Sequence, residues 1–203
     1  MPFKSQFFVF EGIDGSGKTT VSKKVSEILS TKSISNLWHR EPTDSIHGQK
    51  IREFLQGKIK LTPDEQLKLF LLDREFSVNE TILPTLKSDT CLVQDRYYFS
   101  TAAYQGRDEE HAADILYMNE DKGFPEPNRV YFLDLSPEEA LERRNTRGGN
   151  KEAFDDEKEQ TRIYQNYLAI LPESTIFVDA TADLEEVVNF CVEDILLSLS
   201  LKT

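Results

Sequence analysis

A glycine-rich segment near the start of the chain restricts the possible folds more than any other feature. Gly12-Ile13-Asp14-Gly15-Ser16-Gly17-Lys18-Thr19 matches the whole pattern G-x-x-x-x-G-K-[ST]. The segment directly follows the apolar run Phe7–Phe10 and opens an amphipathic helical pattern marked by Val21, Val25 and Leu29. A strand, a glycine-rich loop and a helix in this order predict a phosphate-binding loop within an α/β fold.

Each residue type in this loop has a physical role in holding a nucleoside triphosphate. Glycines let the backbone turn its N–H groups inward at φ angles that a Cβ would resist, and the helix N-terminus adds partial positive charge. Lys18 is expected to reach the β- and γ-phosphates, and the Thr19 hydroxyl to join the Mg²⁺ shell. The predicted ATP-binding residues are Gly12, Ile13, Asp14, Gly15, Ser16, Gly17, Lys18, Thr19 and Thr20.

Short runs of apolar, β-branched or aromatic residues recur along the chain, with longer helical patterns between them. Continuous apolar runs of this length are typical of strands buried on both faces. The expected strands are Phe7–Phe10, Ile34–Trp38, Cys91–Val93, Val130–Leu135 and Thr175–Val178. Because strands that alternate with helices pair in parallel, we expect an α/β fold of roughly five parallel strands with helices on both faces. The chain has no linker or internal repeat, so residues 1–203 are expected to form a single domain.

Capping signals predict where several helices begin. Thr62-Pro63-Asp64-Glu65 and Ser136-Pro137-Glu138-Glu139 each combine an N-cap hydroxyl, a proline at the first helical position and an acid at the third. Asp183 with Glu186 is expected to open the last helix, which has apolar residues at intervals of three and four.

The charge balance excludes broad classes of function. The chain has 24 Lys+Arg against 36 Asp+Glu, for a formal net charge of −12, which argues against a general nucleic-acid or anionic-membrane binder. An anionic ligand must therefore meet a local cluster of cations. The sequence contains neither a signal-peptide pattern nor a membrane-spanning apolar run, and the expected location is the cytoplasm. Cys91 and Cys191 lie far apart in apolar segments and are expected to be reduced core thiols.

A second group of candidate site residues ends the predicted strand Cys91-Leu92-Val93-Gln94-Asp95. From this position the Asp95 carboxylate is expected to join Thr19 in the Mg²⁺ shell. Arg96 and the aromatic run Tyr97-Tyr98-Phe99 follow at once. Because ligands bind outside the carboxyl ends of parallel strands, this combination predicts a substrate pocket. A solvated Asp that only ends the strand is the alternative.

Several segments share their order and spacing with one known family. They are Phe10-Glu11-Gly12-Ile13-Asp14-Gly15-Ser16-Gly17-Lys18-Thr19, Arg40-Glu41-Pro42-Thr43-Asp44-Ser45, Leu69-Phe70-Leu71-Leu72-Asp73-Arg74 and Asp95-Arg96-Tyr97, the last extended by Ser100-Thr101-Ala102-Ala103-Tyr104-Gln105-Gly106. From about Phe7 to the Leu168 region the chain thus resembles the thymidylate kinases, a family of P-loop nucleoside monophosphate kinases. The resemblance implies the nucleoside monophosphate kinase fold and phosphoryl transfer from ATP to dTMP, which gives dTDP and ADP on the route to dTTP.

The resemblance implies which residues hold the thymine base. Phe70 would stack on the ring, and Arg74, four residues later on the same helix face, would donate to O4. A guanidinium would face the cytosine amino group donor to donor, so cytidylate should be rejected. Ser100 and Thr101 would line the pyrimidine edge, and Tyr167 is a further implied base contact.

The sugar and the acceptor phosphate are assigned by the same resemblance. Tyr104 would lie where a ribose 2′-OH needs room, and Asp14 would accept from the sugar 3′-OH. Arg40 and Arg96 would hold the monophosphate, since a guanidinium forms paired bonds to phosphate oxygens. The implied dTMP-binding residues are Asp14, Arg40, Phe70, Arg74, Arg96, Ser100, Thr101 and Tyr104.

A lid is implied at about residues 143–156. Some family members carry an arginine in the phosphate loop after the Asp, but this chain has Gly15 there, so the lid is expected to supply that cation. The implied catalytic residues are Lys18, Asp95, Arg96, Arg143 and Arg147, with Arg144 a further lid arginine. The chain has Asn150-Lys151 and Phe154-Asp155-Asp156 where the family has Asp-Arg and Phe-Glu, so which lid arginine acts is left open.

Two other functions are consistent with a phosphate-binding loop. A deoxynucleoside kinase acting on thymidine would need a base for a neutral 5′-OH. A P-loop nucleotide switch would lack a second nucleotide pocket. Arg40 and Arg96 favour an acceptor that already carries phosphate. The expected partners are ATP, dTMP and a second copy of the chain in a homodimer, which the family forms through helices flanking the Asp-Arg-Tyr strand, with no nucleic acid and no membrane.

Overall fold

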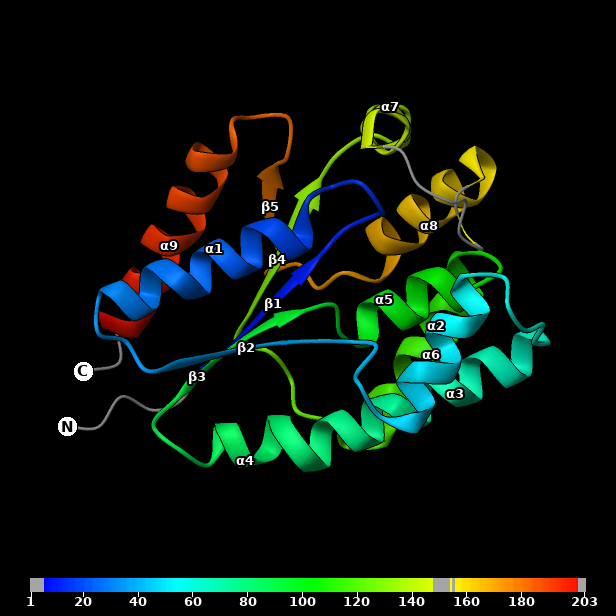
Figure 1. Cartoon of the computed structure of the whole chain (residues 1–203), viewed down its shortest axis with the longest axis horizontal. Helices are drawn as coiled ribbons and strands as arrows, with labels where there is room; N and C mark the ends of the chain where they lie inside the picture. The colour runs from blue at the N-terminus through cyan, green and yellow to red at the C-terminus, as the bar shows by residue number, and fades with distance from the viewer. Residues whose placement is uncertain (1–5, 148–153, 155, 201–203) are drawn as a thin grey trace.

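A parallel sheet lies at the centre of the computed structural model, which describes residues 6–147, 154 and 156–200 (Figure 1). Its strands are β1 (Phe7–Glu11), β2 (Asn36–Arg40), β3 (Cys91–Asp95), β4 (Arg129–Asp134) and β5 (Ile176–Asp179). They lie in the order β2-β3-β1-β4-β5, and each neighbouring pair is parallel. The predicted α/β fold with a five-stranded parallel sheet is therefore confirmed. All carboxyl ends meet at one edge, which is where such folds bind ligands.

The expected strands agree with the observed ones to within two residues at each end, and β2 is displaced most, by two residues at both ends. The apolar run predicts a strand that begins at Ile34, but the pairing with β3 begins with Asn36 opposite Cys91 and continues to Arg40 opposite Asp95. Ile34 instead lies in the turn that follows α1 (Lys18–Thr31), where its N–H donates to the Leu29 carbonyl at 3.0 Å. The shift brings Arg40 to the ligand-binding edge of the sheet.

Helices cover both faces of the sheet, as expected from the alternation of strands and helices. They are α1 (Lys18–Thr31), α2 (Ile46–Leu55), α3 (Pro63–Ser77), the π-helical η1 (Val78–Ile82), α4 (Leu83–Leu86), α5 (Tyr98–Gln105), α6 (Glu109–Asp121), α7 (Pro137–Arg147), α8 (Glu157–Ile170) and α9 (Leu184–Ser200). Figure 1 shows α1 and α9 side by side on one face, with α4, α3, α5 and α6 on the other.

The helix α3 begins at the predicted capping box. The Thr62 hydroxyl accepts from the Glu65 N–H at 3.3 Å, and the Glu65 carboxylate accepts from the Thr62 N–H at 2.8 Å. Ser136 and Glu139 form the same reciprocal bonds before α7, and α9 begins directly after Asp183. These local signals fix the start of α3, which carries Phe70 and Arg74.

The core lies between the sheet and the helices on each face. The side chains of β1 are buried throughout, in agreement with a central parallel strand. Cys91 and Cys191 are free and buried, as the sequence predicts. Within the ranges that the structure describes, no helix is long and apolar enough to cross a membrane.

Candidate active site

The phosphate loop joins β1 to α1 in a shape that only glycine permits at key positions. Gly12 has φ 144°, and a Cβ there would approach the Leu133 carbonyl to 2.9 Å. Gly17, with φ 95°, is the N-cap of α1, and no side chain caps that helix. The first N–H groups of α1 are therefore left for a ligand, and the helix dipole favours an anion there.

Lys18 lies beneath this loop. Its Nζ donates to the Ile13 carbonyl at 2.7 Å and lies 3.8 Å from the Asp14 carboxylate. Burial, together with repulsion from Arg96, lowers the pKa of Lys18 to about 8. Phosphate oxygens would offer this buried ammonium closer anionic partners than Asp14 does. Thr20, the last of the predicted ATP-binding residues, is exposed on the first turn of α1.

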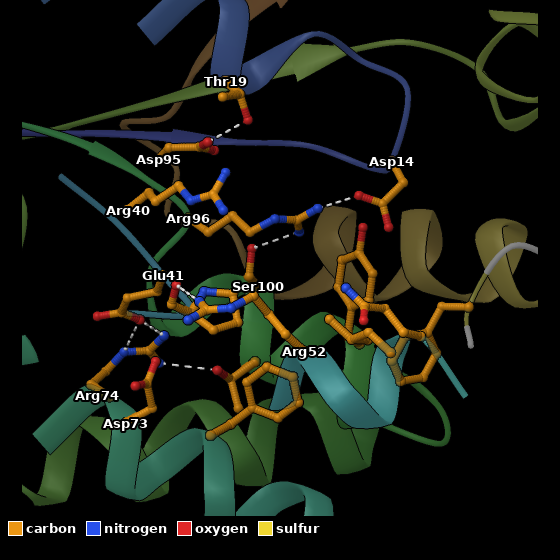
Figure 2. Close-up of a pocket in the computed structure, with 17 residues that line it drawn as sticks. Asp14, Thr19, Arg40, Glu41, Arg52, Asp73, Arg74, Asp95, Arg96 and Ser100 are labelled. Carbon is orange, nitrogen blue, oxygen red and sulfur yellow. Dashed lines mark hydrogen bonds and ion pairs between the residues drawn. The ribbon is translucent and has the colours of Figure 1, made fainter. Parts of the chain in front are cut away.

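Thr19 and Asp95 meet across the crevice between α1 and β3, as the sequence predicts. The Thr19 hydroxyl donates to Asp95 Oδ2 at 2.5 Å (Figure 2). The other carboxylate oxygen, Asp95 Oδ1, is buried and has no hydrogen-bond partner in the structure. A buried carboxylate oxygen with an unused lone pair beside a hydroxyl fits a hard divalent cation.

Arg96 stands between the phosphate loop and α5. Its Nη2 donates to Asp14 Oδ1, and its Nη1 donates to the Ser100 hydroxyl at 3.3 Å (Figure 2). The guanidinium also lies 5.0 Å from the Tyr104 ring centre. Although burial opposes ionisation, Arg96 and Lys18 together lower the pKa of Asp14 to about 2. Asp14 and Arg96 are thus a charged pair at the edge of the sheet.

A cavity of about 360 Å³ opens beside these residues. Its volume lies within the range of sites for small organic ligands. The predicted residues that line it are Asp14, Thr19, Arg40, Phe70, Arg74, Asp95, Arg96, Ser100, Thr101 and Tyr104. Residues as far apart as 14 and 104 therefore meet in one pocket. The wall also contains residues that were not predicted as site residues: Glu41, Pro42, Arg52, Leu55, Gln56 and Asp73, together with Phe154 from the expected lid segment.

Arg74 lines this cavity but is already held by the protein. Its Nε donates to Glu41 Oε2 at 2.9 Å, and its Nη2 also donates to that oxygen. Its Nη1 donates to Thr101 Oγ1 at 3.1 Å and to Asn119 Oδ1 at 3.2 Å. Both members of the ion pair are buried. Glu41 and Asn119 thus orient the predicted base-binding arginine.

Asp73 connects α3 to the loop that follows β2. Its carboxylate accepts from the Thr43 N–H at 2.8 Å and from the hydroxyls of Thr43 and Ser45, each at 2.6 Å. Gly48 allows this approach, because a Cβ there would lie 2.0 Å from the Thr43 carbonyl. The loop that begins with Arg40 and Glu41 is therefore fastened to the helix that carries Phe70.

Glu11, the last residue of β1, is a fully buried carboxylate. It accepts from the Tyr97 N–H, the Ser100 N–H, the Ser100 hydroxyl and the Tyr167 hydroxyl. Burial raises the pKa of Glu11, and the donated bonds and Arg96 oppose that rise. Tyr167, implied as a base contact, is instead fully buried beneath the pocket, and its hydroxyl lies 2.8 Å from Ser100 Oγ.

The carboxylates Glu11, Glu41 and Asp73 were not predicted as site residues. Each lies inside one of the quoted motifs, next to a residue that was predicted. Glu11 also ends an apolar run, and a carboxylate beside a buried strand needs hydrogen-bond partners. This position in the sequence indicates that Glu11 needs hydrogen-bond donors, but it does not identify Tyr97, Ser100 and Tyr167 as those donors.

The expected lid arginines diverge along α7. Arg143 donates to the Ala180 carbonyl at 2.7 Å and does not line the cavity, whereas Arg144 donates to the Asp14 carbonyl at 2.6 Å. Consecutive residues of a helix point in different directions, and in this structure only Arg144 of the two contacts the phosphate loop. The backbone of Arg147 ends α7, while its side chain and the lid residues 148–153 and 155 lie outside the described residues.

Two contacts join the phosphate loop to the far end of the expected lid. Gln160 on α8 accepts from the Asp14 N–H at 3.3 Å, and its Nε2 donates to the Phe154 carbonyl at 2.6 Å. The Phe154 ring packs edge-on against Tyr104 at 5.5 Å between centres. Gln160 and Phe154 thus connect the phosphate loop to the cavity residue Tyr104.

Comparison with known proteins agrees with this geometry. The family model described as thymidylate kinase matches residues 10–191. The chain is 42% identical over 200 residues to the thymidylate kinase of Leptospira interrogans serogroup Icterohaemorrhagiae serovar copenhageni (strain Fiocruz L1-130), covering 98% of each chain. It is 42% identical over 177 residues to the probable thymidylate kinase of Archaeoglobus fulgidus, covering 87% of this chain and 88% of that one. The thymidylate kinase of Brachyspira hyodysenteriae is 31% identical over 200 residues.

Proposed function

Because this chain belongs to the thymidylate kinase family, we propose that it transfers the γ-phosphoryl group of ATP to dTMP and releases ADP and dTDP. The observation that carries this proposal is the shared cavity, in which the end of the phosphate loop meets a second pocket lined by Phe70 and Arg74. A nucleotide switch would not need that second pocket. The cations at its mouth, Arg40 and Arg96, favour an acceptor that is already phosphorylated over thymidine.

The acceptor base is held by α3 and α5. Phe70 stacks on thymine, and Arg74 presents its remaining N–H to O4 while Glu41, Thr101 and Asn119 hold the rest of the guanidinium. Ser100 and Thr101 line the pyrimidine edge. Tyr104 closes the space next to the sugar, and Asp14 accepts from the 3′-OH. The rigid contacts of Arg74 support a base-specific role, because its donors cannot reorient to suit cytosine.

Phosphoryl transfer here requires that the donor and acceptor phosphates be positioned and their negative charges neutralised, rather than a strong base. The acceptor phosphate is already ionised near neutral pH, since its second pKa is about 6. Lys18 and the loop amides hold the donor phosphates, Arg40 holds the acceptor phosphate, and Arg96 bridges the two. An acceptor oxygen forms a bond to the γ-phosphorus as the bond to the β-phosphate oxygen breaks, and ADP leaves.

A divalent cation belongs to this proposal, with Mg²⁺ as the metal. Thr19 and Asp95 would hold it, and the partnerless Asp95 Oδ1 fits that role. In the described part of the chain, no group of three or more His, Cys, Asp or Glu side chains could hold a metal alone. This suits an ion that takes its other ligands from phosphates and water. When bound, Mg²⁺ neutralises charge on the donor phosphates.

The segment at about 143–156 is proposed to close over the phosphates as a lid of this single domain. Arg143 and Arg147 would then reach the transferring group, and water that could hydrolyse ATP would be excluded. The Arg144 and Gln160 contacts to Asp14 support a link between this segment and the phosphate loop.

A homodimer is proposed through the face formed by α3 and α6. Four apolar side chains line a shallow groove there, Leu67, Leu71, Leu72 and Met118, together with the charged residues Asp64, Lys68, Glu75 and Lys122. Such apolar side chains are typical of a surface that a second copy covers. We also propose a cytoplasmic location, which the two free buried cysteines support because thiols stay reduced there.

ADP release with ATP and Mg²⁺ tests the proposed function. We would compare dTMP, dUMP, dCMP, dGMP, AMP, thymidine and no acceptor. A clear maximum with dTMP is expected, with some dUMP activity, because one missing methyl is worth only about 0.8 kcal/mol of burial. A maximum with thymidine would identify a nucleoside kinase. The absence of any acceptor dependence would identify a nucleotide switch.

A further inference from the structure

Glu11 takes no part in the reaction described above, yet its carboxylate is fully buried. Its Oε1 accepts from the Tyr97 N–H at 2.7 Å and from the Ser100 N–H at 3.2 Å. Its Oε2 accepts from the Ser100 hydroxyl at 2.6 Å and from the Tyr167 hydroxyl at 3.0 Å. Every one of these neighbours donates, which suits an ionised group that can only accept. Burying a charge is costly, so this position requires a purpose.

The first thing that Glu11 holds is the turn that carries Arg96. Arg96 has φ 68°, a left-handed conformation that is unfavourable for any residue with a Cβ. Its carbonyl accepts from the Gln94 side chain at 2.9 Å, and the next amide, that of Tyr97, is the one bound by Glu11. Such a conformation persists only where the surroundings fix it. Glu11 therefore stabilises the turn that directs Arg96 toward Asp14.

Glu11 also holds the Ser100 hydroxyl, which donates its single proton in a hydrogen bond to the Glu11 carboxylate. A serine hydroxyl has one O–H donor and two acceptor lone pairs. Because the proton points to Glu11, the Ser100 oxygen faces the pocket as an acceptor, and Arg96 Nη1 donates to it at 3.3 Å (Figure 2). The charge of Glu11 thus sets the direction of the hydrogen bond that orients the guanidinium.

We propose that Glu11 is a positioning residue for phosphoryl transfer, which holds Arg96 in place through the turn before α5 and through the Ser100 hydroxyl. The inference rests on the proposed role of Arg96 at the phosphates. The chain of hydrogen bonds runs from Arg96 through the Ser100 hydroxyl to the buried Glu11 carboxylate, so the role of Arg96 requires Glu11.

The variant Glu11→Gln tests this proposal because it keeps the size of the side chain. A glutamine that still accepts from the Tyr97 and Ser100 amides must point its NH₂ group at the Ser100 oxygen. That group then takes one lone pair of the oxygen and the serine proton must turn elsewhere, so no charge fixes the orientation of the hydroxyl toward Arg96. We expect kcat with dTMP to fall at least about 10-fold, and KM for ATP to change less than about twofold, because a charge-assisted bond is lost near the transferring group only.

A double-mutant cycle with Ser100→Ala asks whether Glu11 acts through Ser100. If it does, the variant with both changes should have about the same kcat as Ser100→Ala alone. Independent, multiplied effects would overturn the proposal, as would an unchanged kcat in Glu11→Gln. If Glu11→Gln does not fold, Glu11→Asp keeps the charge one methylene short. The same fall in kcat is then expected, and wild-type kcat would overturn the proposal.

Tyr131→Phe serves as the control for a general loss of stability. It removes a partly buried hydrogen bond of 2.7 Å to Asp194 on α9, and neither residue lines the cavity. We expect a lower Tm with kcat within about twofold of the wild type. An equal fall in kcat would show that the assay reports stability, and would overturn the proposal. The wild-type rate with dTMP tests the proposed function separately, because it does not depend on these variants.

Discussion

Charged side chains in this protein lie in surroundings that decide what each can do. Lys18 is buried under the phosphate loop, where its Nζ donates to the Ile13 carbonyl and lies 3.8 Å from the Asp14 carboxylate. Because it stands at the N-terminus of α1, its position suits a phosphate. Arg74 is buried as deeply, but Glu41 neutralises its charge and fixes its orientation. In the proposed reaction, Lys18 therefore serves the donor phosphates and Arg74 the acceptor base.

Lys18→Ala is expected to lower kcat by about 100-fold or more, because it removes a preorganised cation from the transferring phosphates. Acceptor-dependent ADP release measures the effect. Lys24→Ala, an exposed lysine on the same helix, is the matched control and should leave kcat unchanged. Near-normal turnover of Lys18→Ala would refute the assignment of the phosphate loop.

Arg74→Ala is expected to destabilise the protein by about 3–5 kcal/mol, because it leaves the Glu41 carboxylate buried without its partner. Urea denaturation measures the free energy of unfolding. In the double variant Glu41→Ala and Arg74→Ala, the loss should be smaller than the sum of the two single losses. Additive losses would mean that the two side chains do not stabilise each other.

At the scale of elements, the acceptor pocket depends on how α2 and α3 pack against the end of β2. Asp73 on α3 binds the backbone and hydroxyl of Thr43, and Gly48 on α2 lets that loop pass closely. The register of β2 with β3 then brings Arg40 beside Asp95. The position of Arg40 therefore follows from contacts among several elements rather than from its own neighbours in sequence.

Gly48→Ala is expected to push α2 away from the loop, since the new Cβ would overlap the Thr43 carbonyl. We expect a loss of about 1–3 kcal/mol of stability, which is usual for overpacking, and a raised KM for dTMP with little change in KM for ATP. Thermal unfolding and steady-state kinetics measure both effects. The exposed residue of the same helix, Lys50→Ala, is the control. Equal changes in both KM values would argue against a local effect.

The helix α7 presents its arginines in different directions, and the kinetics of the variants should separate them. Arg143→Ala or Arg147→Ala is expected to lower kcat more than substrate affinity, since these contacts form mainly in the transition state. Arg144→Ala, which loses the bond to the Asp14 carbonyl, serves for comparison. An unchanged kcat in both Arg143→Ala and Arg147→Ala would remove the lid from the mechanism.

At the scale of the whole molecule, an acidic protein binds anions by gathering a few cations at one edge of its sheet. The net charge is −12, yet four arginines line the cavity together with four carboxylates: Arg40, Arg52, Arg74 and Arg96 with Asp14, Glu41, Asp73 and Asp95. Charges farther away than about 8 Å are largely screened at physiological salt, so the acidic surface does not prevent these arginines from meeting an anion. The four arginines come from β2, α2, α3 and the end of β3.

The proposed homodimer gives a prediction at the same scale. Light scattering is expected to give twice the chain mass of 23.4 kDa. Met118→Asp, in the groove between α3 and α6, should shift the protein toward the monomer, because a charge would be buried in the interface. Leu197→Asp, at an exposed leucine of α9, should not. A monomeric wild type, or dissociation by Leu197→Asp alone, would contradict the α3 and α6 interface.

Local patterns in the sequence determined the phosphate loop, the capping box of α3 and the five parallel strands. These features were predictable because glycine torsions, helix caps and apolar runs depend on residues close together in the chain. The family motifs then placed Phe70, Arg74 and Arg96 in one site, and the cavity brings them together.

Tertiary structure alone decided what holds those residues in place. Glu11 binds groups 86–156 residues away, Glu41 binds Arg74 33 residues away, and Asp73 binds Thr43 30 residues away. The separate directions of Arg143 and Arg144 also follow from packing. A buried carboxylate requires donors, but its sequence neighbours do not say which ones. The packing of distant segments alone selects these donors, because that packing decides which polar groups are buried beside the carboxylate.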